Sequence, residues 1–433
     1  MLHNSTRQST LRTVSLILGL STMLSHETLA GDWPNWLGPR HDATSTESSW
    51  SADWNTGPPA TLWSREVGIG FSSMSISEGR LLTAGHTDGI DTVWCLNAAT
   101  GAVLWTYGYE CPIWDRQHEG GPGTTPTISG RNVYTLSREG HLFCFDVRTG
   151  DVVWKTNVRK QFNVPPRPSK PQKDYGYTGS PLIVDRNLIV PVGGRNANTV
   201  AFDRDSGEVR WASGNEAGET GPGYGAPLAF QWNGEKFLAI FSLKELEVLE
   251  VETGRQRALF PWPTSYGVNA LTPVVENNRI YIASDFGSGI AGFEFDGKQL
   301  RELFRRTDVL CKFNNPIVRN GTIYASTTSG VFKCIDSKTG KLHWQHRSYP
   351  NASLLLAGNR FLCLGDRGDL LAAKMTPNGY KSLSQTKVID GRCWTPPALA
   401  NGVLYVRNAN GRLVALDLIS RGGGTQPTGQ SGD

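Results

Sequence analysis

Polar and aromatic side chains gather in glycine-rich segments of this 433-residue chain. Histidine and glutamate can exchange protons, amides can orient a ligand, and aromatic rings can stack on a flat ring or a sugar face. The residues of these types are His118, Glu119, Tyr175, Tyr177, Tyr224, Tyr266, Asn269, Lys312, Phe313, Asn314, Asn315, Arg392 and Trp394. They are candidates for a ligand or partner surface. The alternative interpretation is that glycine and aromatic residues only close the structural units of the fold.

Catalytic chemistry has weaker support in the sequence. His118 and Glu119 form the best acid–base pair, but sequence neighbours on a loop are usually solvated. None of the eight histidines belongs to an HExxH motif, and no CxxC is present, so the spacing predicts no zinc site. We therefore predict no catalytic residue and no metal ligand.

A repeated hairpin motif must position these candidates. An Asp or Asn precedes a Gly by four residues, and a Trp follows that Gly by four. The Gly takes φ > 0 in a turn with a G1 bulge, the Asp bonds the turn backbone, and the Trp is buried between neighbouring units. The structural residues of this repeat are Asp146, Gly150, Trp154, Asp203, Gly207, Trp211, Asp336, Gly340 and Trp344, with Trp63 and Trp105 from two further copies. The turns explain these aspartates without a catalytic role.

The repeats read as units of four short strands, which is typical of a β-propeller. Turn glycines mark seven complete units, at Gly101, Gly150, Gly207, Gly254, Gly297, Gly340 and Gly379. An eighth unit begins at Pro397 but lacks a Trp strand, and the strand around Trp63 has no hairpin before it. An N-terminal strand that completes the last blade would close the ring. We predict an all-β, eight-bladed β-propeller of four-stranded antiparallel blades, with seven blades as the alternative.

The pattern Asp-x-x-Thr-Gly-x-x-x-Trp, present at 146–154 and 336–344, resembles the repeats of the pyrroloquinoline-quinone (PQQ)-like propeller family. That family includes quinoprotein alcohol dehydrogenases and the outer-membrane assembly factor BamB. The resemblance covers about residues 60–420. Three blades are degenerate, with Phe260, Phe304 and Leu383 near the position of the Trp.

The resemblance also defines what a dehydrogenase of this family would need. Such enzymes hold the quinone between a Trp and a disulfide of two adjacent cysteines, beside a calcium ion ligated by Glu, Asn and Asp. No two cysteines are adjacent in this chain, and no CxxCH is present for a haem. We therefore predict no cofactor and favour a non-enzymatic role, with PQQ and calcium as the alternative.

The first thirty residues differ from the rest. Arg7 and Arg12 precede an apolar run at 14–20, and small residues follow up to Ala30. Because the run is shorter than the roughly 20 residues of a membrane span, we predict a signal peptide over 1–30, cleaved near Ala30. The mature protein is then expected in the periplasm or outside the cell. A net charge of +4 without a basic stripe predicts no nucleic-acid partner.

The remaining boundaries follow from composition. We expect an irregular arm over 31–59 on the domain surface, the propeller over 60–420 and a flexible glycine-rich tail over 421–433. A basic, proline-rich insertion at 159–171 could contact a partner, cover the central funnel or be a simple surface insertion.

The positions of the cysteines allow one disulfide bond. The equivalent cysteines of different blades, Cys95, Cys144 and Cys334, are too far apart to bridge. One pair among Cys111, Cys311, Cys363 and Cys393 could form it.

Three functions are consistent with this sequence. The leading hypothesis is an exported, monomeric, BamB-like propeller that acts as a non-catalytic protein-interaction scaffold for a cell-envelope partner. The second is a propeller that binds a small molecule or glycan in an aromatic funnel. The third is a quinoprotein-like oxidoreductase.

Overall fold

The computed structural model describes the chain except for residues 2–30, 55–56, 166–174, 215–220, 222 and 420–433. The predicted signal peptide (apart from Met1), the glycine-rich tail and residues 166–171 of the proline-rich insertion therefore lie outside the described residues. No helix in the described part is long and apolar enough to cross a membrane.

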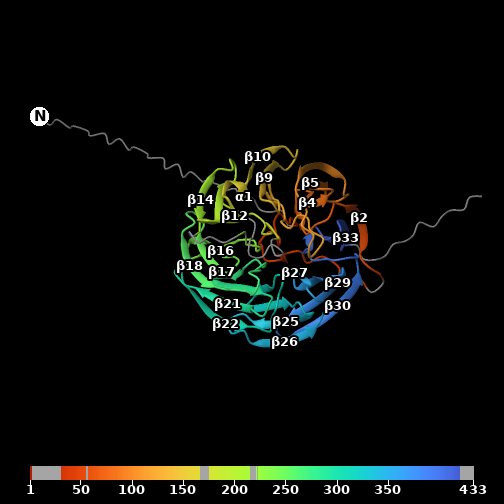
Figure 1. Cartoon of the computed structure of the whole chain (residues 1–433). Coiled ribbons are helices and arrows are strands. Elements are labelled where there is room, and N and C mark those ends of the chain that lie inside the picture. The colour runs from red at the N-terminus through yellow and green to blue at the C-terminus, as the bar shows by residue number, and fades with distance from the viewer. Residues whose placement is uncertain (2–30, 55–56, 166–174, 215–220, 222, 420–433) are drawn as a thin grey trace, which may run out of the picture.

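Eight sheets, each with four antiparallel strands, are arranged in a ring as the blades of a propeller (Figure 1). Blade 1 contains β3 (Ser75–Ser77), β4 (Arg80–Thr87), β5 (Ile90–Asn97) and β6 (Val103–Glu110). Blade 2 contains β7 (Thr127–Ser129), β8 (Asn132–Leu136), β9 (His141–Asp146) and β10 (Val152–Asn157), followed by the helix α1 (Val158–Gln161). Blade 3 contains β11 (Leu182–Val184), β12 (Asn187–Gly194), β13 (Ala197–Asp203) and β14 (Val209–Ser213). Blade 4 contains β15 (Leu228–Trp232), β16 (Glu235–Phe241), β17 (Glu245–Glu250) and β18 (Gln256–Pro261).

The second half of the ring repeats this arrangement. Blade 5 contains β19 (Val274–Glu276), β20 (Arg279–Ser284), β21 (Gly289–Phe295) and β22 (Leu300–Arg306). Blade 6 contains β23 (Ile317–Arg319), β24 (Thr322–Ser326), β25 (Val331–Asp336) and β26 (Leu342–Arg347). Blade 7 contains β27 (Ser353–Ala357), β28 (Arg360–Leu364), β29 (Asp369–Thr376) and β30 (Gly379–Lys387), and β1 (Thr44–Ser45) adds a fifth strand. Blade 8 contains β31 (Ala398–Ala400), β32 (Val403–Arg407) and β33 (Arg412–Asp417). The eight-bladed prediction is confirmed.

The N-terminal strand closes the ring as predicted. β2 (Ala60–Glu66) pairs antiparallel with β33 and becomes the outer strand of blade 8. Trp63 lies opposite Ala415, which matches the pairing of Trp211 with Ala201 inside blade 3. The last blade is therefore held by segments from both ends of the chain, and the ring has no open joint.

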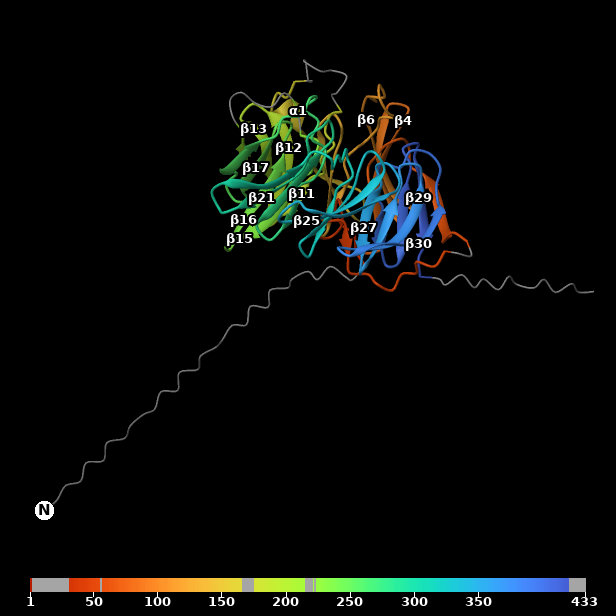
Figure 2. The same ribbon diagram turned by 90° about the horizontal axis from the view of Figure 1, so that it is seen from below.

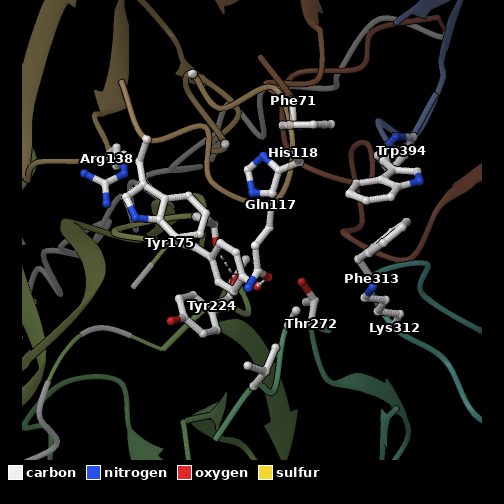
Figure 3. Close-up of a pocket in the computed structure, with 18 of the residues that line it drawn as sticks. Phe71, Gln117, His118, Arg138, Tyr175, Tyr224, Thr272, Lys312, Phe313 and Trp394 are labelled. Carbon is white, nitrogen blue, oxygen red and sulfur yellow. Dashed lines mark hydrogen bonds between the residues drawn. The ribbon is translucent and has the colours of Figure 1, made fainter. Parts of the chain in front are cut away.

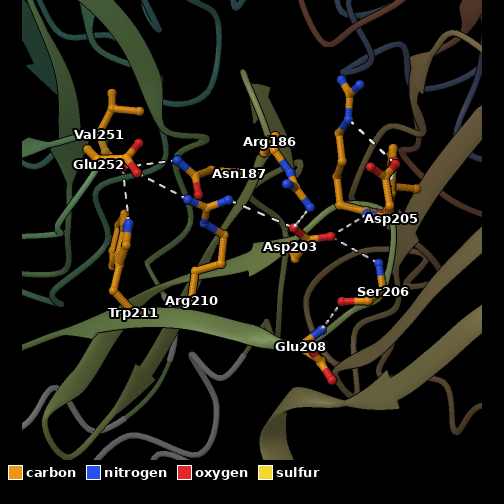
Figure 4. Close-up of polar contacts among 12 residues, drawn as sticks. Arg186, Asn187, Asp203, Asp205, Ser206, Glu208, Arg210, Trp211, Val251 and Glu252 are labelled. Carbon is orange, nitrogen blue, oxygen red and sulfur yellow. Dashed lines mark hydrogen bonds and ion pairs between the residues drawn. The ribbon is translucent and has the colours of Figure 1, made fainter.

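Each tryptophan of the repeat joins its blade to the next one, as blades 3 and 4 show (Figure 4). The Oδ1 atom of Asp203 accepts hydrogen bonds from the amides of Asp205 (3.0 Å) and Ser206 (3.1 Å) and so shapes the turn of blade 3. Nε1 of Trp211 donates to the carbonyl of Val251 in blade 4 at 3.0 Å. The indole covers Gly254, where a Cβ atom would lie only 2.3 Å from the ring, so this turn requires glycine.

The same joint recurs between other blades. Nε1 donates to a turn carbonyl of the next blade from Trp63 (2.9 Å), Trp105 (3.0 Å), Trp154 (3.0 Å) and Trp344 (2.7 Å). The strand register shifts immediately beside each of these residues, as a bulge after the turn requires.

In the three degenerate blades, other residues occupy the tryptophan position of the joint. Phe304 occupies the tryptophan position, since it lies opposite Gly292 and covers Gly340. In blades 4 and 7 the register places Ala258 and Ser384 at that position, in place of the neighbouring Phe260 and Leu383.

The N-terminal arm contributes to the core as well as to the surface. Trp33, Leu37, Trp50 and Trp54 are all buried. The amide of Trp54 donates to Oγ of Ser384 at 3.3 Å, so the arm packs where blade 7 lacks its tryptophan. Figure 2 shows the arm, in red and orange, at the end of the propeller opposite α1.

We predict that the joint dominates stability. Trp211→Ala removes a buried indole and should lower the free energy of unfolding by about 3–5 kcal/mol. Trp211→Phe should cost less than Trp211→Ala, because an aromatic ring remains although part of the packing and the Nε1 hydrogen bond are lost. Val209→Ala, at an exposed position of the same strand, is the control in urea unfolding. Equal losses for Trp211→Ala and Val209→Ala would contradict this account.

All seven cysteines are buried free thiols. Burial raises the pKa of each of them, for example to about 12 for Cys311 and Cys393. Because the thiolate is the reactive form, we predict negligible reaction with Ellman's reagent at pH 8 in the folded protein. Seven thiols should react after denaturation, and fewer would reveal a disulfide.

Candidate functional site

A cavity of about 280 Å³ lies among the loops that meet inside the ring, and we call it the aromatic pocket. Most of its lining comes from the loops that join the outer strand of one blade to the inner strand of the next. It is lined by Trp36, Phe71, Trp114, Gln117, His118, Gly121, Gly123, Arg138, Tyr175, Thr178, Tyr224, Ala226, Val268, Ala270, Thr272, Phe286, Lys312, Phe313, Trp394 and Pro396. Its volume is close to the lower limit for small-molecule sites.

Aromatic rings form two sides of this pocket (Figure 3). On one side Tyr175 stacks on His118, with ring centroids 5.5 Å apart, and meets the edge of Tyr224 at 5.5 Å. On the other side Trp394 contacts Phe313 at 4.6 Å and stacks near Phe71 at 5.7 Å. Phe71 also meets the edge of His118 at 5.0 Å, so the two sides join there, and the ring faces suit contact with a flat group.

The charges around the pocket are mostly positive. Nη1 of Arg392 lies 2.7 Å from Oε2 of Glu119, so these two candidates neutralise each other. Nζ of Lys312 lies 5.6 Å from the centroid of Trp394, and no carboxylate in the described part of the chain forms an ion pair with it. Among the described residues, no Asp or Glu lines the pocket. The lining therefore favours a ligand with negative charge.

His118 is neutral at physiological pH. Burial lowers its pKa from 6.5 to about 4; Glu119 opposes this change, whereas Arg392, Arg138 and Lys312 reinforce it. The amide of Gly120 donates to Nδ1 of His118 at 3.1 Å. The proton of the neutral ring therefore resides on Nε2, which can act as a hydrogen-bond donor.

Six of the predicted candidates line the pocket, namely His118, Tyr175, Tyr224, Lys312, Phe313 and Trp394. Glu119 and Arg392 form their ion pair close to it, and Tyr266 is exposed with its ring against the edge of Phe286. The others lie beneath the surface.

The buried candidates hold loops together and do not face a ligand. Nδ2 of Asn269 donates to the carbonyls of Ser242 (3.0 Å) and Leu243 (3.2 Å). Nδ2 of Asn315 donates to Thr272 at 2.6 Å. Asn314 in the same way bonds the carbonyl of Ser326, and the hydroxyl of Tyr177 donates to Val192 at 3.1 Å. We expected these amides to orient a ligand; instead they satisfy backbone carbonyls.

Several lining residues were absent from the sequence prediction. Trp114 and Gln117 belong to the same loop as His118, and the hydroxyl of Tyr175 donates to Oε1 of Gln117 at 2.7 Å. Phe286 has φ = 59°, a conformation that is costly for a bulky residue and that holds its ring at the pocket. An aromatic residue directly before a loop glycine, Gly287, was the signal that could have identified Phe286.

The described residues do not fit the quinone and calcium site of a dehydrogenase. No group of three or more His, Cys, Asp or Glu side chains in the described part could hold a metal ion. None of the pocket residues is a cysteine. The donor set thus lacks both the carboxylate ligands and the adjacent thiols that such a site requires.

The blade repeat and the ring closure define a quinoprotein-like β-propeller. A sequence model of the family described as outer membrane protein assembly factor BamB matches residues 111–346 and 251–377, and the chain belongs to this family. The BamB of Yersinia pestis is 23% identical over 309 residues, which is 66% of this chain and 72% of that protein. The dehydrogenase subunit of a quinone alcohol dehydrogenase from Komagataeibacter europaeus is 30% identical over 129 residues, covering 27% of this chain and 16% of the relative.

Solved structures show the same fold. BamB from Moraxella catarrhalis superposes with a TM-score of 0.61 at 17% identity, over 84% of this chain and 99% of that one. The quinohemoprotein alcohol dehydrogenase of Comamonas testosteroni gives 0.62 at 13% identity, over 92% of this chain and 82% of the other. At such identities the similarity establishes the fold alone.

We predict that His118 makes stability depend on pH. Its folded pKa of about 4 is lower than the unfolded value of 6.5, so the unfolded chain binds more protons between these values. Stability should therefore fall as pH decreases from 6.5 to 4 and should not fall further from this residue below 4. Melting temperatures of His118→Gln should lack this component, with His343→Gln, at an exposed position, as the control. Parallel profiles for wild type and His118→Gln would contradict the assignment.

Proposed function

We propose that this protein is an exported, non-catalytic binding propeller of the cell envelope, and that its aromatic pocket binds a flat ring that carries negative charge. The observation that carries the proposal is the pair of aromatic sides with Lys312 beside Trp394, where no carboxylate of the described residues pairs with the ammonium group. Stacking supplies affinity for a ring, and the ammonium group supplies preference for an anion.

The positions of the polar groups support binding over catalysis. The Nδ1 atom of His118 is occupied by the amide of Gly120, and Glu119 is engaged by Arg392. A general base needs an available lone pair within reach of its substrate. The remaining Nε2 proton of His118 suits a hydrogen bond to an anionic group of the ligand.

Protein scaffolding is the second candidate, and family membership favours it. The chain belongs to a family named for an outer-membrane assembly factor. Exposed apolar side chains lie close to the pocket, with Ile113 beside Trp114 and Tyr266 against Phe286. In this version the pocket-bearing face receives a protein partner of the envelope, with an aromatic or acidic side chain of that partner in the pocket. A quinoprotein oxidoreductase is a weaker alternative, because the donor set does not fit its cofactor.

We predict that 2-naphthoate binds the pocket and that uncharged 2-naphthol binds more weakly. Trp394→Ala should weaken 2-naphthoate about tenfold through lost stacking. Lys312→Met should remove the preference for the carboxylate and leave 2-naphthol binding unchanged. Tyr266→Ala, which leaves the pocket lining intact, is the control in isothermal titration calorimetry.

Two outcomes would change the proposal. If neither aromatic probe nor a glycan panel binds, the pocket does not hold a small ligand, and the scaffold function remains. If PQQ with calcium binds more tightly than 2-naphthoate and supports alcohol oxidation, the protein is an oxidoreductase.

A further inference from the structure

A short part of the N-terminal arm, residues 33–38, crosses the base of the ring, and we call it the strap. Trp33 pairs with Ile76 of blade 1 through two backbone hydrogen bonds of 2.8 Å. Only three residues later, Nε1 of Trp36 donates to Oγ1 of Thr272 at 2.9 Å, immediately before blade 5.

These two contacts place the strap on the axis. Blades 1 and 5 lie opposite each other in a ring of eight. Three residues span at most about 11 Å, so the chain can reach both blades only by passing across the central channel. The carbonyl of Pro34 also accepts a hydrogen bond from Ile128 of blade 2 at 2.9 Å, which fixes the strap between its ends. Figure 2 shows the arm at the end of the propeller away from α1.

Trp36 belongs to the strap and to the pocket at once. It lines the cavity together with Thr272, its hydrogen-bond partner. The next residue, Leu37, is buried among apolar side chains that include Ile317 of blade 6. The indole is therefore held by its own hydrogen bond and by the anchored residue beside it.

We propose that Trp36 is the floor of the aromatic pocket and the residue that limits how deep a ring ligand can enter. The strap makes a blind pocket from a channel that the eight blades alone would leave open at the base. The length of the bound ligand is then set by the N-terminal arm and not by the blades. For its ligand readout, this inference rests on the proposed ring-binding function.

The first experiment compares two probes of different length, 2-naphthoate and the longer biphenyl-4-carboxylate, on the full chain. Trp36→Ala should shift the ratio of their dissociation constants about tenfold toward the longer probe, as a change of pocket size by a few carbon atoms allows. Trp36→Phe keeps a ring at the floor and should preserve the wild-type ratio. Trp50→Ala removes a buried tryptophan of the arm that does not line the pocket, and it should also preserve the ratio. An unchanged ratio in Trp36→Ala would overturn the proposal.

The second experiment does not depend on any ligand. Ala270→Cys introduces a thiol into the pocket of a protein whose own cysteines are all buried. Adding Trp36→Ala should raise the labelling rate of this thiol by a charged methanethiosulfonate at least severalfold, because the base of the channel opens. Adding Trp50→Ala should leave this labelling rate unchanged. Equal labelling rates with and without the Trp36→Ala change would overturn the assignment of Trp36 as the floor. If the ring probes do not bind but the labelling rate rises, the floor assignment stands and only the ring-binding proposal fails.

Discussion

The fold depends on one contact, an indole of one blade lying on the glycine turn of the next. The ring covers Gly101, Gly150, Gly207 and Gly254 so closely that a Cβ atom would lie less than 3 Å from it. The Nε1 hydrogen bond to the same turn fixes the indole along the blade edge, as Trp211 does with Val251. Packing and direction are thus specified together, so the angle between blades is constrained as well as their distance. Phe304 retains the packing without the hydrogen bond, and at Ser384 the arm supplies Trp54 from outside the blade.

Where the ring closes, a charged side chain, Arg407, is buried, and its desolvation costs free energy. The guanidinium group of Arg407 is fully buried and donates to the carbonyls of Ser72 (2.9 Å), Ala84 (2.8 Å) and Gly68 (3.0 Å). No carboxylate forms an ion pair with it in the described part of the chain, and burial lowers its pKa to about 10. Arg407 remains a cation under physiological conditions, so its hydrogen bonds must offset a large desolvation penalty. These bonds tie blade 8 to the loop that carries Phe71.

The sequence predicts the architecture well because each joint is local. Asp, Gly and Trp stand at fixed spacing within one hairpin, and the unpaired strand at Trp63 shows how the ring closes. The pocket was predicted only in part. Trp394 and Tyr175 lie on loops that any closed ring brings to its axis, so their convergence follows from the topology. The sequence does not show that Asn269 bonds three backbone carbonyls and does not face a ligand. That outcome depends on the course of the loops, which do not follow the sequence repeat. Trp36 meets Thr272 across 236 residues of sequence, and no pattern within a repeat indicates that contact.

The same fold is found in assembly factors and in dehydrogenases, so the fold cannot decide between them, and the contents of the channel must. A dehydrogenase needs carboxylates to hold a metal and a base with a free lone pair. Here the carboxylate of Glu119 is neutralised by Arg392, and Nδ1 of His118 already accepts a hydrogen bond. Among the described lining residues, the aromatic faces, the ammonium group of Lys312 and the Nε2–H group of His118 are suited to attract and orient an anion. A strap across the base agrees with this chemistry, because a site that only holds its ligand gains contact area from a closed floor and needs no second opening.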